Sequence, residues 1–225
     1  MDVVTLYAPS VFRVHAGLIT APLGARPDKP LELYEFEACP FCRKVREAIS
    51  MLDLEADLRP CPKGGTRYRP AAEARSGKAQ FPFLIDPNTG VELLESTAIV
   101  DYLFKSYGTG KTPLVMRPFI ATPTAGLGSA FRHGGMRARP SRTPEQDLEL
   151  VGFEASPWCR RVRETLCELE LPYRLTNVAK KSPSRPAFIE RSGKMQVPWL
   201  HDPNTGVEMF ESADIVRYLD DTYAL

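Results

Sequence analysis

The sequence lacks long hydrophobic runs and any marked excess of charge of one sign. No stretch of its 225 residues approaches the roughly 18 uninterrupted apolar residues of a membrane helix. Lys and Arg total 29 against 28 for Asp and Glu, so the formal net charge of +1 gives no argument for nucleic acid as a partner. Hydrophobic content of 43% and charged content of 25% are typical of soluble globular proteins, and the length suffices for one large or two small domains.

Cysteine and histidine are sparse as well. Five cysteines, an odd number at irregular spacing, do not fit a secreted disulfide framework and suit a reducing compartment. The three histidines, His15, His133 and His201, are scattered along the chain. A structural zinc ion needs four Cys or His ligands at close spacing, so no metal site is predicted. The acid at Asp2 and the missing apolar core argue against a signal peptide at the start.

The motif Cys39-Pro40-Phe41-Cys42 organises the rest of the chain. It follows an apolar run, Leu31–Phe36, that predicts a strand, and it opens helical spacing over 41–52. Cys39 falls at the helix N-cap and Pro40 at the first helical position, where a missing N–H costs nothing. A thiol there faces unpaired backbone N–H groups and the positive end of the helix dipole. We therefore expect the pKa of Cys39 to lie below the free value of about 8.5.

Positive charge and a second thiol accompany Cys39. Arg43 and Lys44 add positive charge close by. Cys42 lies one helical turn further on, within reach to close a disulfide and expel a group bound to Cys39. The alternative is a pair of structural cysteines or half of a zinc site. The sequence favours thiol or redox chemistry, with Cys39 and Cys42 as the catalytic residues. Only Cys39 is expected to combine the helix N-terminus with exposure.

The segments after the motif predict further strands and helices of an α/β unit. Gly77 is a natural residue just after a helix, Pro87-Asn88-Thr89-Gly90 is a turn sequence, and Ser96 can cap a helix. The predicted order is therefore βαβαββα. Its later elements are strands at 56–60, 83–86 and 91–94 and helices around 71–75 and from Ser96 onward.

The same pattern returns about 117 residues later. Leu31-Glu32-Leu33 recurs as Leu148-Glu149-Leu150, and Asp86 through Glu92 recurs letter for letter as Asp202 through Glu208. Matches this dense, in the same order, indicate two copies of one domain. Further matched pairs are Pro40 with Pro157, Cys42 with Cys159, Pro82 with Pro198, and Glu95-Ser96 with Glu211-Ser212.

The repeat divides the chain into four parts. Residues 31–107 and 148–225 are the two predicted domains. Residues 1–30 carry four prolines without a clear period and are expected to form an extended arm packed on the body. Residues 108–147 form a linker that is fairly apolar over 114–131 and then basic. A short helix in the groove between the domains is the favoured interpretation of the linker, and a membrane-surface helix is the alternative.

This order, with Cys-Pro-x-Cys after the first strand, resembles the thioredoxin superfamily and specifically the N-terminal domain of glutathione S-transferases and the related glutaredoxins. The motif at Cys39, Phe81-Pro82 before the third strand and Glu95-Ser96 at the last helix carry the resemblance. It implies two tandem thioredoxin-like α/β domains, each with a four-stranded mixed sheet and three helices. The tandem arrangement is similar to plant chloroplast proteins with two such domains, which implies a chloroplast location.

The resemblance also implies a glutathione site in each repeat. Cis bonds at Phe81–Pro82 and Val197–Pro198 would expose a backbone edge with which glutathione could pair, as an added strand does. A Ser at a helix N-terminus suits the γ-glutamyl carboxylate and the neighbouring Glu its ammonium. Lys78 and Lys194 are candidates for the glycine carboxylate. The implied glutathione-binding residues are Phe81, Pro82, Glu95, Ser96, Ser156, Val197, Pro198, Glu211 and Ser212.

Several residues depart from the family pattern. The linker is too short and proline-rich for the all-helical C-terminal domain of a glutathione transferase. Ser156 replaces Cys39 in the second repeat and cannot form a mixed disulfide, although it could donate a hydrogen bond to a bound thiolate. Cys159 is expected to face inward and Cys167 to lie in the core. Cys61 should lie on the Cys39 side of the sheet, either as a second resolving thiol or as a loop cysteine without a partner.

The leading functional hypothesis is a glutathione-linked thiol–disulfide oxidoreductase, similar to glutaredoxins. Cys39 would attack a glutathionylated or disulfide protein substrate, and Cys42 or a second glutathione would resolve the product. Glutathione is the expected co-substrate, and neither nucleic acid nor a membrane span is expected. The alternatives are a non-catalytic glutathione-type binding or scaffold protein, a glutathione transferase-like activity, and iron–sulfur cluster carriage through Cys39 and external glutathione.

Overall fold

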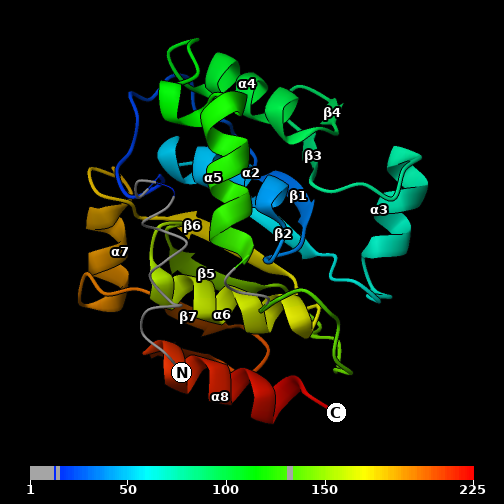
Figure 1. Ribbon diagram of the computed structural model, residues 1–225. Coiled ribbons are helices and arrows are strands. Elements are labelled where there is room, and N and C mark those ends of the chain that lie inside the picture. The colour runs from blue at the N-terminus through cyan, green and yellow to red at the C-terminus, as the bar shows by residue number, and fades with distance from the viewer. Residues whose placement is uncertain (1–12, 14–15, 131–133) are drawn as a thin grey trace.

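The computed structural model describes residue 13, residues 16–130 and residues 134–225, and it contains the predicted βαβαββα unit twice (Figure 1). The first unit consists of β1 (Leu31–Glu35), α2 (Pro40–Met51), β2 (Ala56–Pro60), α3 (Arg69–Ser76), β3 (Phe83–Asp86), β4 (Val91–Leu93) and α4 (Ser96–Tyr107). The second consists of β5 (Leu148–Gly152), α6 (Pro157–Glu168), β6 (Tyr173–Asn177), α7 (Arg185–Ser192), β7 (Trp199–Asp202), β8 (Val207–Phe210) and α8 (Ser212–Tyr223).

These two units are the predicted pair of thioredoxin-like domains, and the element boundaries differ little from expectation. The first strand ends at Glu35, one residue earlier than predicted, and α3 extends beyond 71–75 at both ends. Pro70 lies in the first turn of α3, where its missing N–H removes no hydrogen bond of the helix. Gly77 follows the last residue of the helix with a φ of 72°.

The eight strands form one continuous sheet in the order β4-β3-β1-β2-β6-β5-β7-β8. Each unit contributes the expected four-stranded mixed sheet, with one parallel and two antiparallel pairings. The two halves join edge to edge where β2 pairs antiparallel with β6, which the sequence did not predict. Asp57 faces Arg174 at the centre of this junction, and their side chains form an ion pair of 2.8 Å. Because these residues occupy equivalent positions in the repeats, an approximate two-fold axis passes between them.

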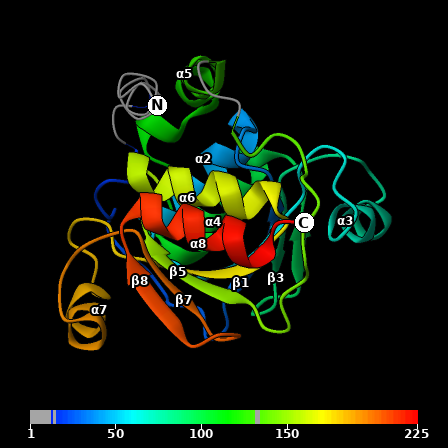
Figure 2. The same cartoon turned by 90° about the horizontal axis from the view of Figure 1, so that it is seen from below.

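The helices α2, α4, α6 and α8 gather on one face of the sheet, whereas α3 and α7 lie at opposite ends of the molecule (Figure 2). A single apolar core spans both repeats, because β1, β5 and the inner faces of these four helices all contribute to it. Leu31 and Leu33 in β1 and Leu148 and Leu150 in β5 are fully buried in that core. The alternation of buried and half-buried residues along β1 matches the two-residue period of a strand.

The linker contains a 3-10 turn (Leu114–Met116) and helix α5 (Pro118–Ala130), which crosses the outside of α2 (Figure 1). Ala121 and Ala125 are fully buried on the inner face of α5. Two threonines of α5 accept hydrogen bonds that hold the same face of the helix against the body of the protein. Lys44 donates from Nζ to Oγ1 of Thr122 at 3.0 Å, and Arg13 donates from Nη1 to Oγ1 of Thr124 at 2.7 Å.

The described part of the arm runs over both repeats. Thr20 donates its backbone N–H to Lys180, which belongs to the second repeat. Ala21 and Gly24 donate to Met51 and Tyr107 of the first. The part of the arm that the structure describes therefore packs on the body. No helix in the described part of the chain is long and apolar enough to cross a membrane.

A ring of four buried charges joins the repeats beneath the helix N-termini. Arg46 of α2 contacts Glu154 at 3.1 Å, and Arg163 of α6 contacts Glu37 at 3.0 Å. Each arginine also contacts the glutamate of its own repeat, at 3.2 Å for Arg46–Glu37 and 2.8 Å for Arg163–Glu154. All four side chains are at most 2% exposed. Because both arginines and both glutamates are equivalent pairs in the repeats, the ring obeys the same approximate two-fold symmetry as the sheet.

Candidate active site

Cys39 lies at the N-cap of α2, as the sequence predicted. Its backbone is extended at φ −75° and ψ 120°, and Pro40 is the first helical residue. The Cys42 backbone N–H donates to the Cys39 Sγ at 3.3 Å, which satisfies one of the unpaired donors of the helix start. The local sequence dictates this geometry, because proline fixes the first helical φ and cannot itself donate to the cap.

The environment of Cys39 favours the thiolate. A hydrogen bond from the Cys42 thiol, the backbone N–H groups of Cys42 and Phe41 and the charge of Arg46 together outweigh burial and lower the pKa of Cys39 to about 7. Arg43, which was expected to supply charge, instead forms an ion pair of 3.0 Å with Glu47. Burial and the neighbouring Cys39 raise the pKa of Cys42 well above its ordinary value. The two thiols of the motif are therefore unequal.

Cys39 opens into a pocket of about 350 Å³ and not directly onto the surface. The residue is only 4% exposed, which corrects the expectation that it would be the exposed thiol. The pocket brings together Cys39, Phe81, Glu95 and Ser96, all of which were predicted as site residues. Pro82 is not among the described residues that line it. The remaining lining residues are Phe36, Phe41, Arg69, Ala79 and Gln80.

Two of these lining residues, Arg69 and Gln80, were missed by the sequence analysis. Arg69 lies over the Phe81 ring at 4.7 Å and donates to the Cys61 carbonyl at 3.0 Å. Gln80 donates from Nε2 to the Glu95 carboxylate at 2.5 Å. A signal for both exists in the repeat, since Arg-Pro recurs at Arg185 and a Gln precedes the X–Pro bond again at Gln196.

Glu95 and Glu211 share an unusual backbone conformation. Their φ and ψ values are 70° and 105° for Glu95 and 68° and 108° for Glu211, and each residue is the N-cap of the last helix of its repeat. A positive φ costs free energy in a residue other than glycine and persists where the surroundings impose it. Phe81–Pro82 and Val197–Pro198 are both cis, as predicted. The two repeats therefore present the same backbone at equivalent places.

The second repeat has a matching pocket of about 340 Å³ without a thiol. Val197, Pro198, Glu211 and Ser212, which were predicted as site residues, line it. The other lining residues are Trp158, Arg161, Gln196 and Ala213, with Trp158 at the position of Phe41 and Arg161 at that of Lys44.

Several other predicted residues do not line the two pockets within the described structure. Ser156 is buried at the N-cap of α6, where its Oγ accepts the Cys159 backbone N–H at 3.3 Å. Lys78 and Lys194, the candidates for the glycine carboxylate, also lie outside the linings, and Lys194 extends over the Phe210 ring at 4.3 Å.

The remaining cysteines are buried and free. Cys61 belongs to the same apolar cluster as Cys39 and Cys42, which places it on the predicted side of the sheet. It is fully buried, and burial raises its pKa. Burial also raises the pKa of Cys159 and Cys167, both of which face the core as expected. Cys39 is thus the one cysteine among the five whose pKa is lowered.

Glu35 is a buried carboxylate beneath the motif that the sequence analysis missed. It ends β1, pairs with Nη1 of Arg46, and its charge helps to raise the pKa of Cys42. Burial raises its own pKa to about 7 despite the opposing charge of Arg46. The second repeat has Gly152 at this position, and a Cβ there would lie 2.8 Å from the Sγ of Cys159. The buried carboxylate is therefore present only in the repeat that holds the reactive thiol.

Comparison with known proteins identifies the domain type. A profile of the glutathione S-transferase N-terminal domain matches the chain twice, over residues 33–112 and 150–225. Two fungal proteins described as glutathione S-transferase-like, tpcF of Aspergillus fumigatus and OpS6 of Beauveria bassiana, are 33% and 31% identical to the chain over 78 residues. These matches cover 35% of this chain and 34% and 36% of the respective relatives, so they span about a third of each relative's length.

A solved structure of a trimeric glutathione transferase from Leishmania, TDR1, also matches. The similarity covers 85% of this chain and 68% of that chain, with 15% identity and a TM-score of 0.30.

Proposed function

Because this chain belongs to the glutathione S-transferase N-terminal domain family, with that domain present twice, we propose that it is a glutathione-linked thiol–disulfide oxidoreductase. Cys39 is the proposed nucleophile. The observation that carries the proposal is the combination of a helix N-cap, a pKa lowered to about 7 and a pocket of about 350 Å³ in front of the same sulfur. A thiolate, and not a thiol, is the nucleophile in disulfide exchange.

The pocket residues suit glutathione as the co-substrate. Ser96 begins α4, and the free N–H groups of a helix start attract a carboxylate such as that of the γ-glutamyl group. The Glu95 carboxylate, held by Gln80, suits the neighbouring ammonium. The ladder between β1 and β3 ends at the pair Tyr34–Phe83, so the backbone of Phe81 lies beyond it and suits pairing with the extended peptide.

The proposed first step is one disulfide exchange. The Cys39 thiolate attacks the glutathione sulfur of a glutathionylated protein, the Cys39–glutathione disulfide forms, and the protein thiolate leaves and takes up a proton. In the second step the thiolate of another glutathione attacks this mixed disulfide. Oxidised glutathione then leaves, and Cys39 returns as the thiolate.

Cys42 offers a slower alternative to the second glutathione. Its thiolate could attack the Cys39 sulfur, close a Cys39–Cys42 disulfide and release reduced glutathione. Burial and the adjacent Glu35 charge raise the pKa of Cys42, so this thiol is mostly protonated near neutral pH. The route through the second glutathione is therefore favoured over the dithiol route.

The second repeat is proposed to bind without redox turnover. Ser156 stands where Cys39 stands in the first repeat, and Cys159 is buried with a raised pKa.

A transferase activity is not proposed. Outside the two repeats, the helices of the described residues are the 3-10 turn and α5, which do not amount to an all-helical domain. On the basis of the resemblance we propose glutathionylated or disulfide proteins as the substrates and the chloroplast as the location.

A matched pair of single-atom substitutions tests the proposal. The measurement is the glutathione-dependent reduction of a glutathionylated peptide by the purified protein. Cys39→Ser should abolish turnover, whereas Cys42→Ser should retain part of it, because only the Cys39 sulfur faces the pocket as a thiolate. Equal loss in both variants would indicate an obligatory dithiol mechanism. Unchanged turnover in both would refute the oxidoreductase proposal.

A further inference from the structure

Helix α5 of the linker forms a third layer on the outside of the molecule. In Figure 1 it crosses in front of α2, and in Figure 2 it lies beyond the layer of α2 and α6, on the side away from the sheet. Its inner face is made of two alanines, Ala121 and Ala125, and of Thr122 and Thr124, which accept hydrogen bonds from Lys44 and Arg13. Its outer face consequently lies on the surface of the protein, where Phe119 and Leu127 are exposed.

That outer face is apolar. Phe119, Pro123 and Leu127 recur at four-residue spacing and so lie along one stripe of the helix. Phe119 is 70% exposed and Leu127 52% exposed, and Leu114 of the preceding 3-10 turn is 67% exposed. Single exposed apolar residues are ordinary, but an aligned row of them on one helix marks an interaction surface. We call this row of Phe119, Pro123 and Leu127, together with Leu114 of the preceding 3-10 turn, the α5 stripe.

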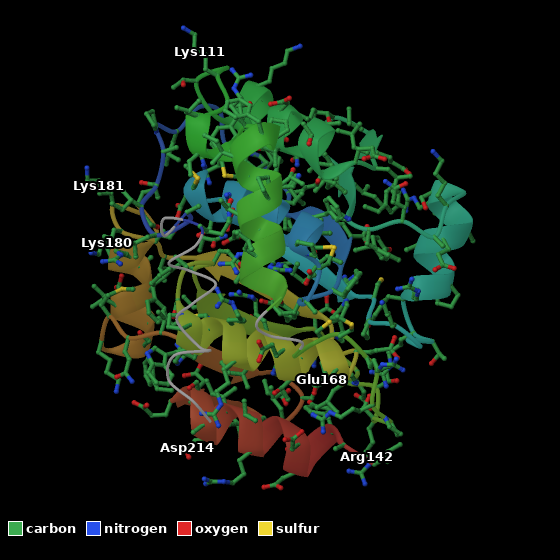
Figure 3. All side chains as sticks on the ribbon, viewed as in Figure 1. Lys111, Arg142, Glu168, Lys180, Lys181 and Asp214 are labelled. Carbon is green, nitrogen blue, oxygen red and sulfur yellow. The ribbon has the colours of Figure 1, made fainter. Side chains whose placement is uncertain are left out.

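The charge of the surrounding segment has one sign. Residues 102–144 contain no Asp or Glu, while they contain seven Lys and Arg residues. Lys105 in the last turn of α4 is exposed, as are Lys111 and Arg117 in the segment that leads into α5. Figure 3 shows Lys111 projecting away from the body of the molecule. The residue directly before this segment, Asp101, is acidic. Its carboxylate accepts a hydrogen bond from Thr112.

We propose that the α5 stripe and its adjoining cations dock the protein on the surface of a bilayer that contains anionic phospholipid. An interfacial helix inserts aromatic and aliphatic side chains at the headgroup level while flanking Lys and Arg side chains contact lipid phosphates. The stripe supplies the first group and Lys105, Lys111 and Arg117 the second. This inference is independent of the redox chemistry proposed for Cys39.

Sedimentation with lipid vesicles tests the proposal on the whole chain. Vesicles made of phosphatidylcholine and about one third phosphatidylglycerol should bind the protein. Vesicles of phosphatidylcholine alone should bind it much less. Binding should weaken as salt is added, because salt screens exposed charges. Neutralising one cation, as in Lys111→Gln or Arg117→Gln, should lower the affinity about fivefold.

The apolar half of the proposal has its own variants. Phe119→Ser with Leu127→Ser should weaken vesicle binding by more than about tenfold, because both side chains would otherwise enter the interface. Both residues are exposed, so the fold should survive, and circular dichroism and the melting temperature would verify that. The matched control is Ile189→Ser, which removes an apolar side chain of 41% exposure from α7 at the far end of the molecule. The control should bind vesicles like the unmodified protein.

Three outcomes would overturn the proposal. The first is no binding to anionic vesicles at low salt. The second is equal binding by the unmodified protein and the Phe119→Ser, Leu127→Ser variant. The third is a concentration-dependent dimer, measured by light scattering, that the same variant dissociates, since the stripe would then serve as a contact between two copies of this chain.

Discussion

At the residue scale, the reactivity of this protein depends on what surrounds a single sulfur. The position of Cys39 at the N-cap could be predicted because capping is local and needs only Pro40 and the helical spacing that follows. The burial of Cys39 and the presence of Glu35 beneath the motif could not, because both arise from contacts with distant strands and helices. The alternation of β1 does place Glu35 on the face of Leu31 and Leu33, yet a charged residue there gives no sign of its partner.

The titration of Cys39 is the prediction at this scale. The rate of alkylation by iodoacetamide should rise with pH about a midpoint near 7, because the thiolate reacts and the pKa of Cys39 is lowered to about 7. Mass spectrometry after brief labelling should find the label on Cys39 before any other cysteine. Cys39→Ser is the control and should leave the protein almost unlabelled. A midpoint near 9, or Cys159 labelled as fast as Cys39, would contradict this account.

At the element scale, the N-terminal halves of α2 and α6 are joined by the buried ring of Arg46, Glu37, Arg163 and Glu154. The sequence contained all four residues in matched pairs but gave no reason to bring them together. Judged from the sequence of its own helix alone, Arg46 or Arg163 would be expected on a face exposed to solvent. The pairing emerges only when β2 pairs with β6 and joins the two repeats edge to edge.

Loss of one carboxylate from the ring should be costly. Glu154→Gln should lower the free energy of unfolding by about 3–5 kcal/mol, because it leaves buried guanidinium charge uncompensated. Urea denaturation at pH 7 measures this loss. The control Glu149→Gln removes a partly exposed partner of Arg191 and should cost less than about 1 kcal/mol. Equal, small losses in both variants would show that the ring does not stabilise the fold.

The acid dependence of stability follows from the same residue. Burial opposes ionisation of Glu154, but the charges of Arg163 and Arg46 outweigh it and lower the pKa to about 2 from an ordinary value of 4.5. Its stabilisation is therefore fully present above pH 4.5 and is lost as the pH falls toward 2. The difference in stability between the unmodified protein and Glu154→Gln should shrink across that window. A difference that stays constant from pH 5 to pH 2.5 would contradict the assigned pKa.

At the scale of the whole molecule, two thioredoxin-like domains share one sheet and one core. The order of elements and the duplication were readable from the sequence, because the repeat preserves turn and capping residues. The β2–β6 junction was not, since an edge strand carries no mark of the strand that it will meet. Asp57 and Arg174 read as ordinary surface charges until the register places them opposite each other.

A shared sheet predicts a single cooperative unfolding transition. Both tryptophans, Trp158 and Trp199, lie in the second repeat, so tryptophan fluorescence reports on that repeat alone. Exposure of the fully buried Cys42 to a thiol reagent reports on the first. The two signals should change at the same urea concentration, because separating the repeats would expose the edge strands and the common core. Two transitions resolved along the urea axis would show that the repeats are thermodynamically independent.

The central claim is that Cys39 carries glutathione as a mixed disulfide, and trapping that species tests it most directly. The Cys42→Ser variant is incubated with oxidised glutathione at pH 7, so that the Cys39 thiolate displaces one glutathione thiolate and retains the other half. Intact mass and peptide mapping then locate the adduct. The account predicts one glutathione per chain, on Cys39. No adduct, or an adduct on Cys61, Cys159 or Cys167 with Cys39 unmodified, would contradict it.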